Sequence, residues 1–171
     1  MEGFLDPVKI LKEMRLRRNM TAVDFGCGSG GWAIPLAKEL EEGKVIAIDI
    51  LEEPLSALRA RAKLEKILNI EMVLANAEKG TDLFENSADL VLMTNLLFQC
   101  EDRKKVLEEG KRVLKNSGKI LVIDWNLESF MGPKEGRITP EEVKKLAQEI
   151  GLKNKEEFKA SSYHYGLIFE K

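Results

Sequence analysis

The sequence predicts a single α/β domain built around a mainly parallel sheet. Short apolar segments alternate with longer segments of helical periodicity, and two similar segments, GKVIAID from Gly43 and GKILVID from Gly118, are apolar enough for strands buried on both faces. The chain has 171 residues, of which 44% are hydrophobic and 33% charged, so one domain can bury a core and keep a solvated surface. We therefore expect residues 1–171 to form one domain without an internal linker.

Composition and charge exclude several classes of protein. No apolar run approaches the roughly 18–20 residues that cross a bilayer, and Met1–Ile10 lacks a signal-peptide core. The net charge of −2 offers no general attraction for a nucleic-acid backbone. Cys27 and Cys100 lie far apart, and His164 is the only histidine, which leaves no metal-ligand spacing. We expect a cytoplasmic protein with reduced thiols, without a metal, and with neither nucleic acid nor membrane as a partner.

The elements of the first half follow from apolar spacing and from residues that start or end helices. Pro35 falls in the first turn of a helix, where a missing N–H costs little, and Gly43 can end that helix. We expect a helix over Pro7–Arg17, a strand over Thr21–Phe25, a glycine-rich turn over Gly26–Gly31, a helix over Trp32–Glu41, a strand over Lys44–Ile50, a helix over Pro54–Leu68 and a strand over Ile70–Ala75.

The second half has clearer helix starts. Thr139, Pro140 and Glu142 form a capping box with proline at the first helical position. The polar stretch Glu78–Ala88 has too little apolar periodicity for a helix. We expect a strand over Asp89–Thr94, a helix over Arg103–Lys115 closed by Asn116–Gly118, a strand over Lys119–Asp124, a loop over Asn126–Ile138, a helix from Thr139 that ends at Gly151, and two antiparallel strands within Phe158–Glu170, around Tyr163.

The residues that end the first two strands predict a ligand site. In open α/β sheets, ligands bind beyond the carboxyl ends of the strands. The first strand runs into VDFGCGSGG (Val23–Gly31), whose glycines permit a sharp turn and close approach of a ligand, and the next helix offers unpaired N–H groups. Asp49 ends the second strand, about 20 residues on, which suits an acid bonded to ribose hydroxyls. The pattern favours an adenosine-containing cofactor over a turn that serves packing alone.

Asp24 bears on which cofactor binds. Gly26, Gly28 and Gly31 also satisfy a dinucleotide pattern, so an NAD(P)-dependent oxidoreductase remains an alternative. A carboxylate beside the loop would repel a pyrophosphate and would suit a cofactor that carries an ammonium and a sulfonium. Asp24 as a local cap on loop N–H groups is the structural alternative. The short chain and the lack of a Tyr-x-x-x-Lys pair also argue against an oxidoreductase.

Five segments, in this order and spacing, resemble the successive motifs of class I S-adenosylmethionine-dependent methyltransferases. They are VDFGCGSG, VIAIDI, ANAE (75–78), DLVLMTNLLFQ (89–99) and LKNSGKILVIDW (114–125). The chain resembles most the small, single-domain group related to quinone-pathway methyltransferases. The resemblance implies a Rossmann-like three-layer sandwich with a seven-stranded, mainly parallel sheet whose last strand is antiparallel. It also implies S-adenosyl-L-methionine as cofactor, S-adenosyl-L-homocysteine as product and a small-molecule acceptor, while acceptor identity and oligomeric state stay open.

The resemblance also implies roles for individual residues. Asp24 and the loop residues Gly26, Cys27, Gly28, Ser29 and Gly30 would hold the methionyl part, Asp49 the ribose hydroxyls, Ile50 the adenine face, Asn76 and Ala77 the adenine edge, and Asn95 and Leu96 the border of the methyl-transfer channel. The chain departs from the family in having Asn76 where aspartate is usual, and in lacking histidines near Phe98 and Gln99.

No residue stands out as a general base. Methyl transfer from a sulfonium needs alignment and an accessible lone pair, and positioning alone can supply much of the rate. His164, Tyr163 and Tyr165 are candidates for removing a proton, although ordinary strand positions are the favoured reading. Arg137 and the basic first helix are weaker candidates for binding an anionic acceptor, and Trp32 and Phe98 are expected in the core. A non-catalytic S-adenosylmethionine-binding module is a third alternative.

Overall fold

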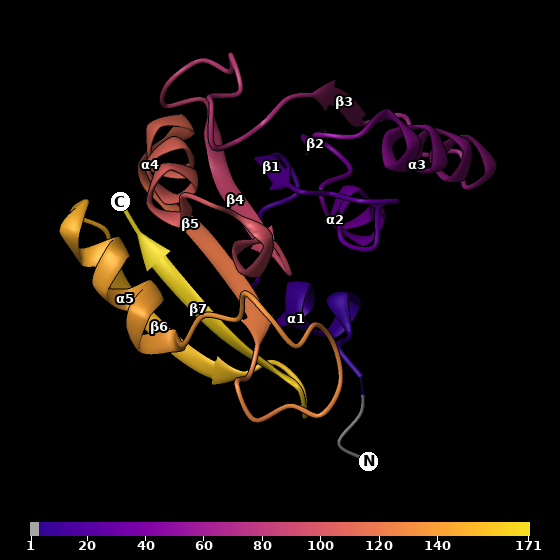
Figure 1. Ribbon diagram of the computed structural model, residues 1–171. Helices are drawn as coiled ribbons and strands as arrows, with labels where there is room; N and C mark the ends of the chain where they lie inside the picture. Colours follow the sequence, from indigo (N-terminus) through magenta and orange to yellow (C-terminus); the bar gives the residue numbers. More distant parts are fainter. Residues whose placement is uncertain (1–3) are drawn as a thin grey trace.

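A seven-stranded sheet with helices on both faces makes up the computed structural model, which describes residues 4–171 (Figure 1). The strand order is β3-β2-β1-β4-β5-β7-β6; β1 to β5 run parallel, and β7 is antiparallel to both β5 and β6. The predicted Rossmann-like fold, with its antiparallel last strand, is confirmed. The elements are α1 (Pro7–Glu13), β1 (Thr21–Phe25), α2 (Ala33–Glu39), β2 (Lys44–Asp49), α3 (Glu52–Leu64), β3 (Ile70–Leu74), β4 (Ala88–Thr94), the 3-10 turn η1 (Leu97–Gln99), α4 (Arg103–Val113), β5 (Leu114–Trp125), α5 (Pro140–Glu149), β6 (Lys153–Lys159) and β7 (His164–Glu170).

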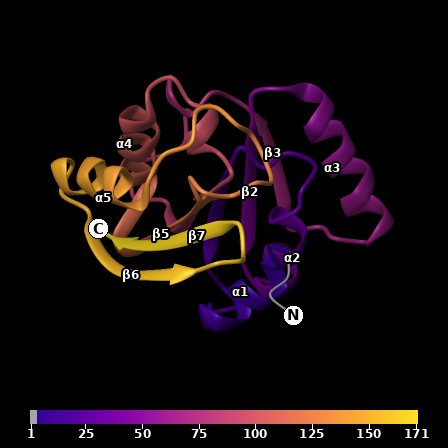
Figure 2. The same ribbon diagram turned by 60° about the horizontal axis from the view of Figure 1, so that its bottom comes forward.

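Each face of the sheet has its own core. Helices α4 and α5 cover one face, where Phe25, Val122 and Phe169 are fully buried. Helices α1, α2 and α3 cover the other, around Leu36 and Leu92 (Figure 2). Because neighbouring residues of a strand point to opposite faces, the central strands need apolar residues at nearly every position. This explains why the GKVIAID and GKILVID segments look alike without being a repeat.

Four helices, α1 to α4, are shorter at their carboxyl ends than predicted. Helix α1 ends at Glu13 rather than at Arg17, because Arg15 adopts a left-handed backbone with φ +51°. Helix α3 begins at Glu52, before the predicted Pro54, and ends before Lys66, whose φ is +55°. Helix α2 also ends within its predicted range. The sequence gives no strong signal for a non-glycine residue with a left-handed backbone. The helices predicted from apolar spacing therefore extend beyond the ends that the structure shows.

Two strands begin earlier than predicted. Leu114, placed in a helix by its spacing, pairs instead with Ala88 at the start of β5, and the expected turn around Ser117 lies within that strand, where the register shifts. Strand β6 begins at Lys153 although KNKEEFK has no apolar alternation. It is an edge strand whose residues are nearly all exposed, and its hydrogen bonds to β7 alone define it.

Candidate functional site

A cavity of about 330 Å³ lies at the carboxyl edge of the sheet, beyond the ends of β1, β2, β3 and β4. This is the position at which open α/β sheets bind ligands. Its wall contains most of the predicted site residues, namely Gly26, Gly28, Asp49, Ile50, Asn76, Ala77 and Leu96. Asp24, Cys27, Ser29, Gly30 and Asn95 are not in this wall.

The cavity also contains residues that the sequence analysis missed. These are Ile48, Leu51, Pro54, Ala75, Glu78, Gln99, Cys100 and Val106. Ile48, Leu51, Ala75 and Glu78 lie at or within four residues of a strand end, so the rule that led to Asp49 would have found them if applied to the positions around each strand end. Pro54 and Val106 instead lie in α3 and α4. Gln99 lies in the 3-10 turn η1 and Cys100 directly follows it. No sequence pattern predicted this turn.

Asp49 fixes the glycine loop. Its Oδ2 accepts a hydrogen bond from the Gly28 backbone N–H at 2.9 Å, and its Oδ1 accepts one from the Leu51 N–H at 3.1 Å. Gly28 has φ +52°, and nothing lies within 4 Å of the position that a Cβ would occupy, so the loop leaves open space there. At Gly30 a Cβ would instead overlap Leu58, so that glycine serves helix–loop packing.

Asp24 lies in the protein interior, not at the lip of the cavity as expected. The residue is fully buried in β1, and neither carboxylate oxygen has a hydrogen-bond partner. Burial, together with the nearby Asp49 carboxylate, raises the pKa of Asp24 to about 8, and the backbone N–H of Ala33 lowers it by less. The backbone N–H that favours the ionised form is that of Ala33 at the start of α2, not one of the loop N–H groups of the local-cap alternative. The carboxyl group sits beneath the glycine loop as an unsatisfied acceptor.

The opposite wall consists of the turn after β3. Asn76 Oδ1 accepts from the Glu78 N–H at 2.8 Å, and Glu78 Oε1 accepts from the Asp102 N–H at 2.5 Å. The Asn76 amide oxygen is thus already engaged in shaping the turn. At the mouth of the cavity, Ile50 and Leu51 are 61% and 57% exposed, an apolar surface that a planar base could cover.

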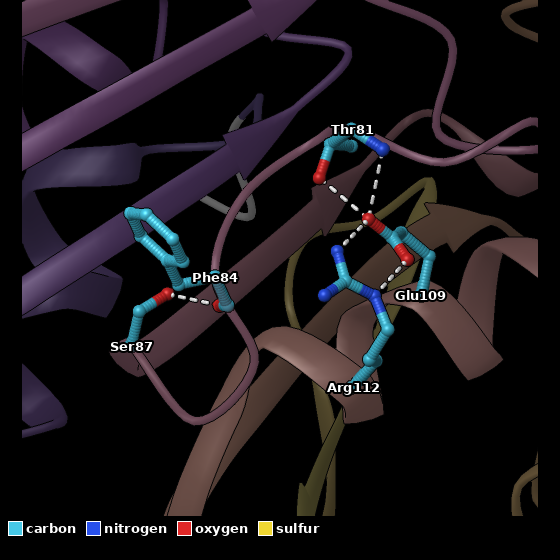
Figure 3. A network of polar contacts seen from close by, with 5 residues as sticks. All are labelled: Thr81, Phe84, Ser87, Glu109 and Arg112. Atoms are coloured by element: carbon cyan, nitrogen blue, oxygen red, sulfur yellow. Dashed lines mark hydrogen bonds and ion pairs between the residues drawn. The ribbon is translucent and has the colours of Figure 1, made fainter.

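A buried ion pair anchors the loop that follows this turn to α4 (Figure 3). Glu109 accepts hydrogen bonds from the Thr81 N–H and hydroxyl, and both of its oxygens pair with the Arg112 guanidinium at 2.7 Å. Burial alone would raise the pKa of Glu109, but the hydrogen bonds from Arg112 and Thr81 lower it to about 2. The loop that follows the turn after β3 is therefore attached to a charged, fully bonded group.

Two candidate acceptor-binding or proton-accepting residues have structural roles instead. The Tyr165 hydroxyl is buried and donates to the Ile138 carbonyl at 3.0 Å. The Arg137 guanidinium donates to the carbonyl oxygens of Asn126, Leu127, Ser129, Met131 and Pro133, all within its own loop. These bonds engage every nitrogen of the group, so Arg137 holds the loop rather than a substrate carboxylate.

Several other chemistries find no support in residues 4–171. No group of three or more His, Cys, Asp or Glu side chains is placed to hold a metal ion, and no helix is long and apolar enough to span a bilayer. Both cysteines are free thiols, and burial raises their pKa values, that of Cys100 to about 12. A thiol with a raised pKa is a poor nucleophile.

The donor set fits S-adenosylmethionine. The unpartnered Asp24 carboxyl can balance an ammonium, the open face at Gly28 admits a chain along the loop, and Asp49 keeps lone pairs for ribose hydroxyls. A pyrophosphate in the same place would stand against the Asp49 carboxylate in the cavity wall.

Comparisons with known proteins agree with this geometry. A family model described as a methyltransferase domain matches residues 16–164. A demethylmenaquinone methyltransferase of Oceanobacillus iheyensis is 32% identical over 126 residues, which are 73% of this chain and 52% of the relative. The chain spans about half the length of the curated relatives it matches.

Solved structures show the same arrangement. A crystal structure of an S-adenosylmethionine-dependent methyltransferase from Aquifex aeolicus has a TM-score of 0.89 at 30% identity, covering 96% of this chain and 89% of that one. The [4+2]-cyclase SpnF has a TM-score of 0.85 at 15% identity, covering 96% of this chain and 79% of that one, which shows the fold alone.

Proposed function

The chain belongs to the class I S-adenosylmethionine-dependent methyltransferases, and on that premise we propose that it transfers the methyl group of S-adenosylmethionine to a small-molecule acceptor. The observation that carries the proposal is the cavity in which the Asp49 carboxylate and the open Gly28 backbone face one space at the carboxyl edge of the sheet. S-adenosyl-L-homocysteine would be the second product.

Each wall of the cavity has a distinct task in this proposal. Asp49 would accept hydrogen bonds from the ribose hydroxyls, and Ile50 would cover one face of the adenine. Asp24 and the loop from Gly26 to Gly30 would hold the methionyl end, with Asp24 supplying the counter-charge. When bound, S-adenosylmethionine supplies a methyl group on a sulfonium, whose departure needs no acid. The protein's contribution is therefore alignment of the two reactants and exclusion of water.

We further propose a quinone-related acceptor. The support is the name of the curated relatives, demethylmenaquinone methyltransferase, together with the apolar Leu96 at the boundary between the cavity and the end of β4. The free thiols of Cys27 and Cys100 suit a reducing compartment such as the cytoplasm. At −2 the net charge gives no reason to invoke a nucleic-acid substrate.

Calorimetry with two ligands tests the cofactor. We expect saturable one-to-one binding of S-adenosyl-L-homocysteine and no saturable binding of NADH. Binding of NADH without binding of the nucleoside thioether would replace the proposal with the oxidoreductase alternative.

Turnover tests the acceptor and separates an enzyme from a non-catalytic binding module. The protein is incubated with S-adenosylmethionine and chemically reduced demethylmenaquinone. Parallel reactions contain a phenol, an amine or a thiol as the control acceptor. Formation of S-adenosyl-L-homocysteine is measured in each reaction. Methylation of the reduced quinone above all controls is expected. Product from a different acceptor class would overturn the quinone assignment alone, and no product from any acceptor would favour the binding module.

A further inference from the structure

The unsatisfied polar atoms of the protein gather at one edge of the sheet. Among residues 4–171, the buried side-chain nitrogens and oxygens without a hydrogen-bond partner belong to Asp24, Asn95 and His164 only. Asp24 lies in β1, Asn95 directly follows β4, and His164 begins β7 opposite Trp125, the last residue of β5. Native proteins pair nearly all buried polar groups, so such atoms indicate a ligand. The resemblance assigns Asp24 to the cofactor side and Asn95 to the border of the methyl-transfer channel, which leaves His164 to be explained.

His164 is held rigidly with one nitrogen unused. The side chain is only 4% exposed, its ring packs on the Trp125 indole with centroids 4.0 Å apart, and Nδ1 lies 2.9 Å from Ser161 Oγ. Nε2 has no partner. Burial lowers the pKa of His164 to about 4, so the imidazole is neutral at pH 7. One neutral nitrogen is therefore fixed in direction and free to bond. A hydroxyl group would suit it in either tautomer, because a hydroxyl both donates and accepts.

The surroundings of His164 are aromatic. Phe130, which is 83% exposed, packs edge-on against Tyr163 with centroids 5.3 Å apart. A hollow of about 570 Å³ is lined by the chain neighbours of the pair, Asn126 after Trp125 and Tyr163 before His164, and by Leu127 and Phe130; Trp125 and His164 themselves do not line it. The Asn126 N–H donates to the Tyr163 carbonyl, so the loop after β5 and the β6–β7 turn lie side by side (Figure 1). A hollow with an exposed Phe130 ring, next in the chain to a buried polar atom, suits a ligand with an apolar planar body and one polar group.

The same region adjoins the cofactor cavity. The Asn95 N–H donates to the Ile123 carbonyl of β5, and Leu96 lies in the cavity wall. Trp125 is two residues beyond Ile123 on the same face of β5, where Gly132 of the loop packs on its ring: a Cβ there would lie 2.5 Å from the ring. Gly132 of the loop over residues 126–137 therefore covers the Trp125 ring, on which His164 packs.

We propose that His164 positions the methyl acceptor, its Nε2 forming a hydrogen bond with a hydroxyl group of an acceptor whose planar apolar body packs near Trp125, Phe130 and Tyr163. This inference rests on the proposed function, because it assigns the acceptor side of the same site. His164 is thus a positioning residue that selects acceptors bearing a hydroxyl group.

Two probes of nearly equal shape test the hydrogen bond. Binding of 1-naphthol and of 1-methylnaphthalene is measured by Trp fluorescence in the presence of saturating S-adenosyl-L-homocysteine. The wild type is expected to prefer 1-naphthol by about fivefold to tenfold, as one net hydrogen bond implies. In His164→Phe, which keeps a ring against Trp125, the preference should vanish while the affinity for 1-methylnaphthalene is unchanged. His164→Gln, which retains a polar group near the Nε2 position, should keep part of the preference.

The outcomes separate this inference from the proposed function. If the wild type binds both probes equally, fails to bind either, or keeps its preference in His164→Phe, the inference is wrong even though S-adenosyl-L-homocysteine binds normally. If the wild type fails to bind S-adenosyl-L-homocysteine, the proposed function itself is wrong. Should His164→Phe not fold, His164→Asn provides the same comparison, since it retains a polar group toward Ser161 and removes the one at Nε2.

Discussion

At the scale of single residues, the site depends on a carboxylate that serves both the protein and the proposed ligand. Asp49 accepts hydrogen bonds from the backbone N–H groups of Gly28 and Leu51, and so fixes the loop before any ligand binds. Its oxygens each have a further lone pair, which can accept a ribose hydroxyl. This arrangement is pre-organised, because the acid does not have to reorient on binding.

Replacing Asp49 should therefore weaken cofactor binding more than folding. In Asp49→Ala we expect the dissociation constant for S-adenosyl-L-homocysteine to rise about 10- to 100-fold, since charge-assisted hydrogen bonds contribute about 1.5–3 kcal/mol each. Isothermal titration calorimetry measures the change, and Glu71→Ala, an exposed acid on the neighbouring strand β3, is the matched control. An unchanged dissociation constant in Asp49→Ala would remove Asp49 from the ribose role.

In the proposed function, Asp24 would couple cofactor binding to a proton. With a pKa of about 8, its buried carboxyl is mostly protonated in the free protein at pH 7. An ammonium placed against it favours the ionised form, so binding of S-adenosyl-L-homocysteine should release about one proton. Calorimetry at pH 7 in buffers of different ionisation enthalpy counts that proton. The count should fall to near zero in Asp24→Asn, and a wild-type count near zero would show that the ligand's ammonium does not meet this carboxyl group.

At the scale of elements, the Thr81–Glu109–Arg112 cluster connects the loop after β3 to α4 (Figure 3). Glu109 is buried and fully bonded, so its removal leaves polar groups unpaired. In Glu109→Gln we expect the free energy of unfolding at pH 7 to fall by about 1–3 kcal/mol in urea denaturation. Glu108→Gln, the exposed neighbour on the same helix, should change it little.

The same variant has a predicted pH dependence. The pKa of Glu109 is lowered from 4.5 to about 2 in the folded protein, so its ionised form stabilises the fold above about pH 5. That stabilisation is lost as pH falls from about 5 towards 2. The difference in unfolding free energy between wild type and Glu109→Gln should therefore narrow between pH 6 and pH 3. A constant difference would mean that the charge of Glu109 is not what stabilises the loop.

The loop over residues 126–137 depends on Arg137. Its guanidinium satisfies loop carbonyls that would otherwise need water, so Arg137→Met should loosen the loop while the sheet stays intact. Hydrogen exchange followed by mass spectrometry should show faster exchange in this loop and unchanged exchange in β5. Lys134→Met, an exposed lysine in the same loop, is the control. Equal exchange in Arg137→Met and wild type would contradict this role.

Some elements could be predicted from sequence because burial fixes their residues. The central strands could be predicted because a strand covered on both faces must be apolar throughout. The start of α5 could be predicted because the Thr139–Glu142 capping box depends only on residues close together in the sequence. Strand β6 could not be found, since an exposed edge strand is defined by pairing with β7 rather than by its own residues. The end of α1 depends on the left-handed backbone of Arg15, a conformation that an arginine in the sequence does not indicate.

At the scale of the whole molecule, strand order explains how much of the site could be predicted. Residues of the cavity wall come from the ends of adjacent parallel strands, so Gly28 and Asp49 followed from strand ends, whereas Asn76 followed from the resemblance to the methyltransferase family. The position of Asp24 did not, because strand alternation sets which face it occupies and the packing of α2 then buries it. Gln99 depends on η1, a tertiary feature. The fold by itself does not determine the reaction, which is why the acceptor side rests on His164 and its neighbours.

A crystal structure of the protein with S-adenosyl-L-homocysteine tests the central claim most directly. We expect to find the ribose hydroxyls against Asp49, the adenine over Ile50, and the amino group of the homocysteine chain directed at Asp24 along the glycine loop. Ligand density outside the cavity at the carboxyl edge, or inside it with the ribose turned away from Asp49, would show that this cavity does not bind the cofactor as proposed.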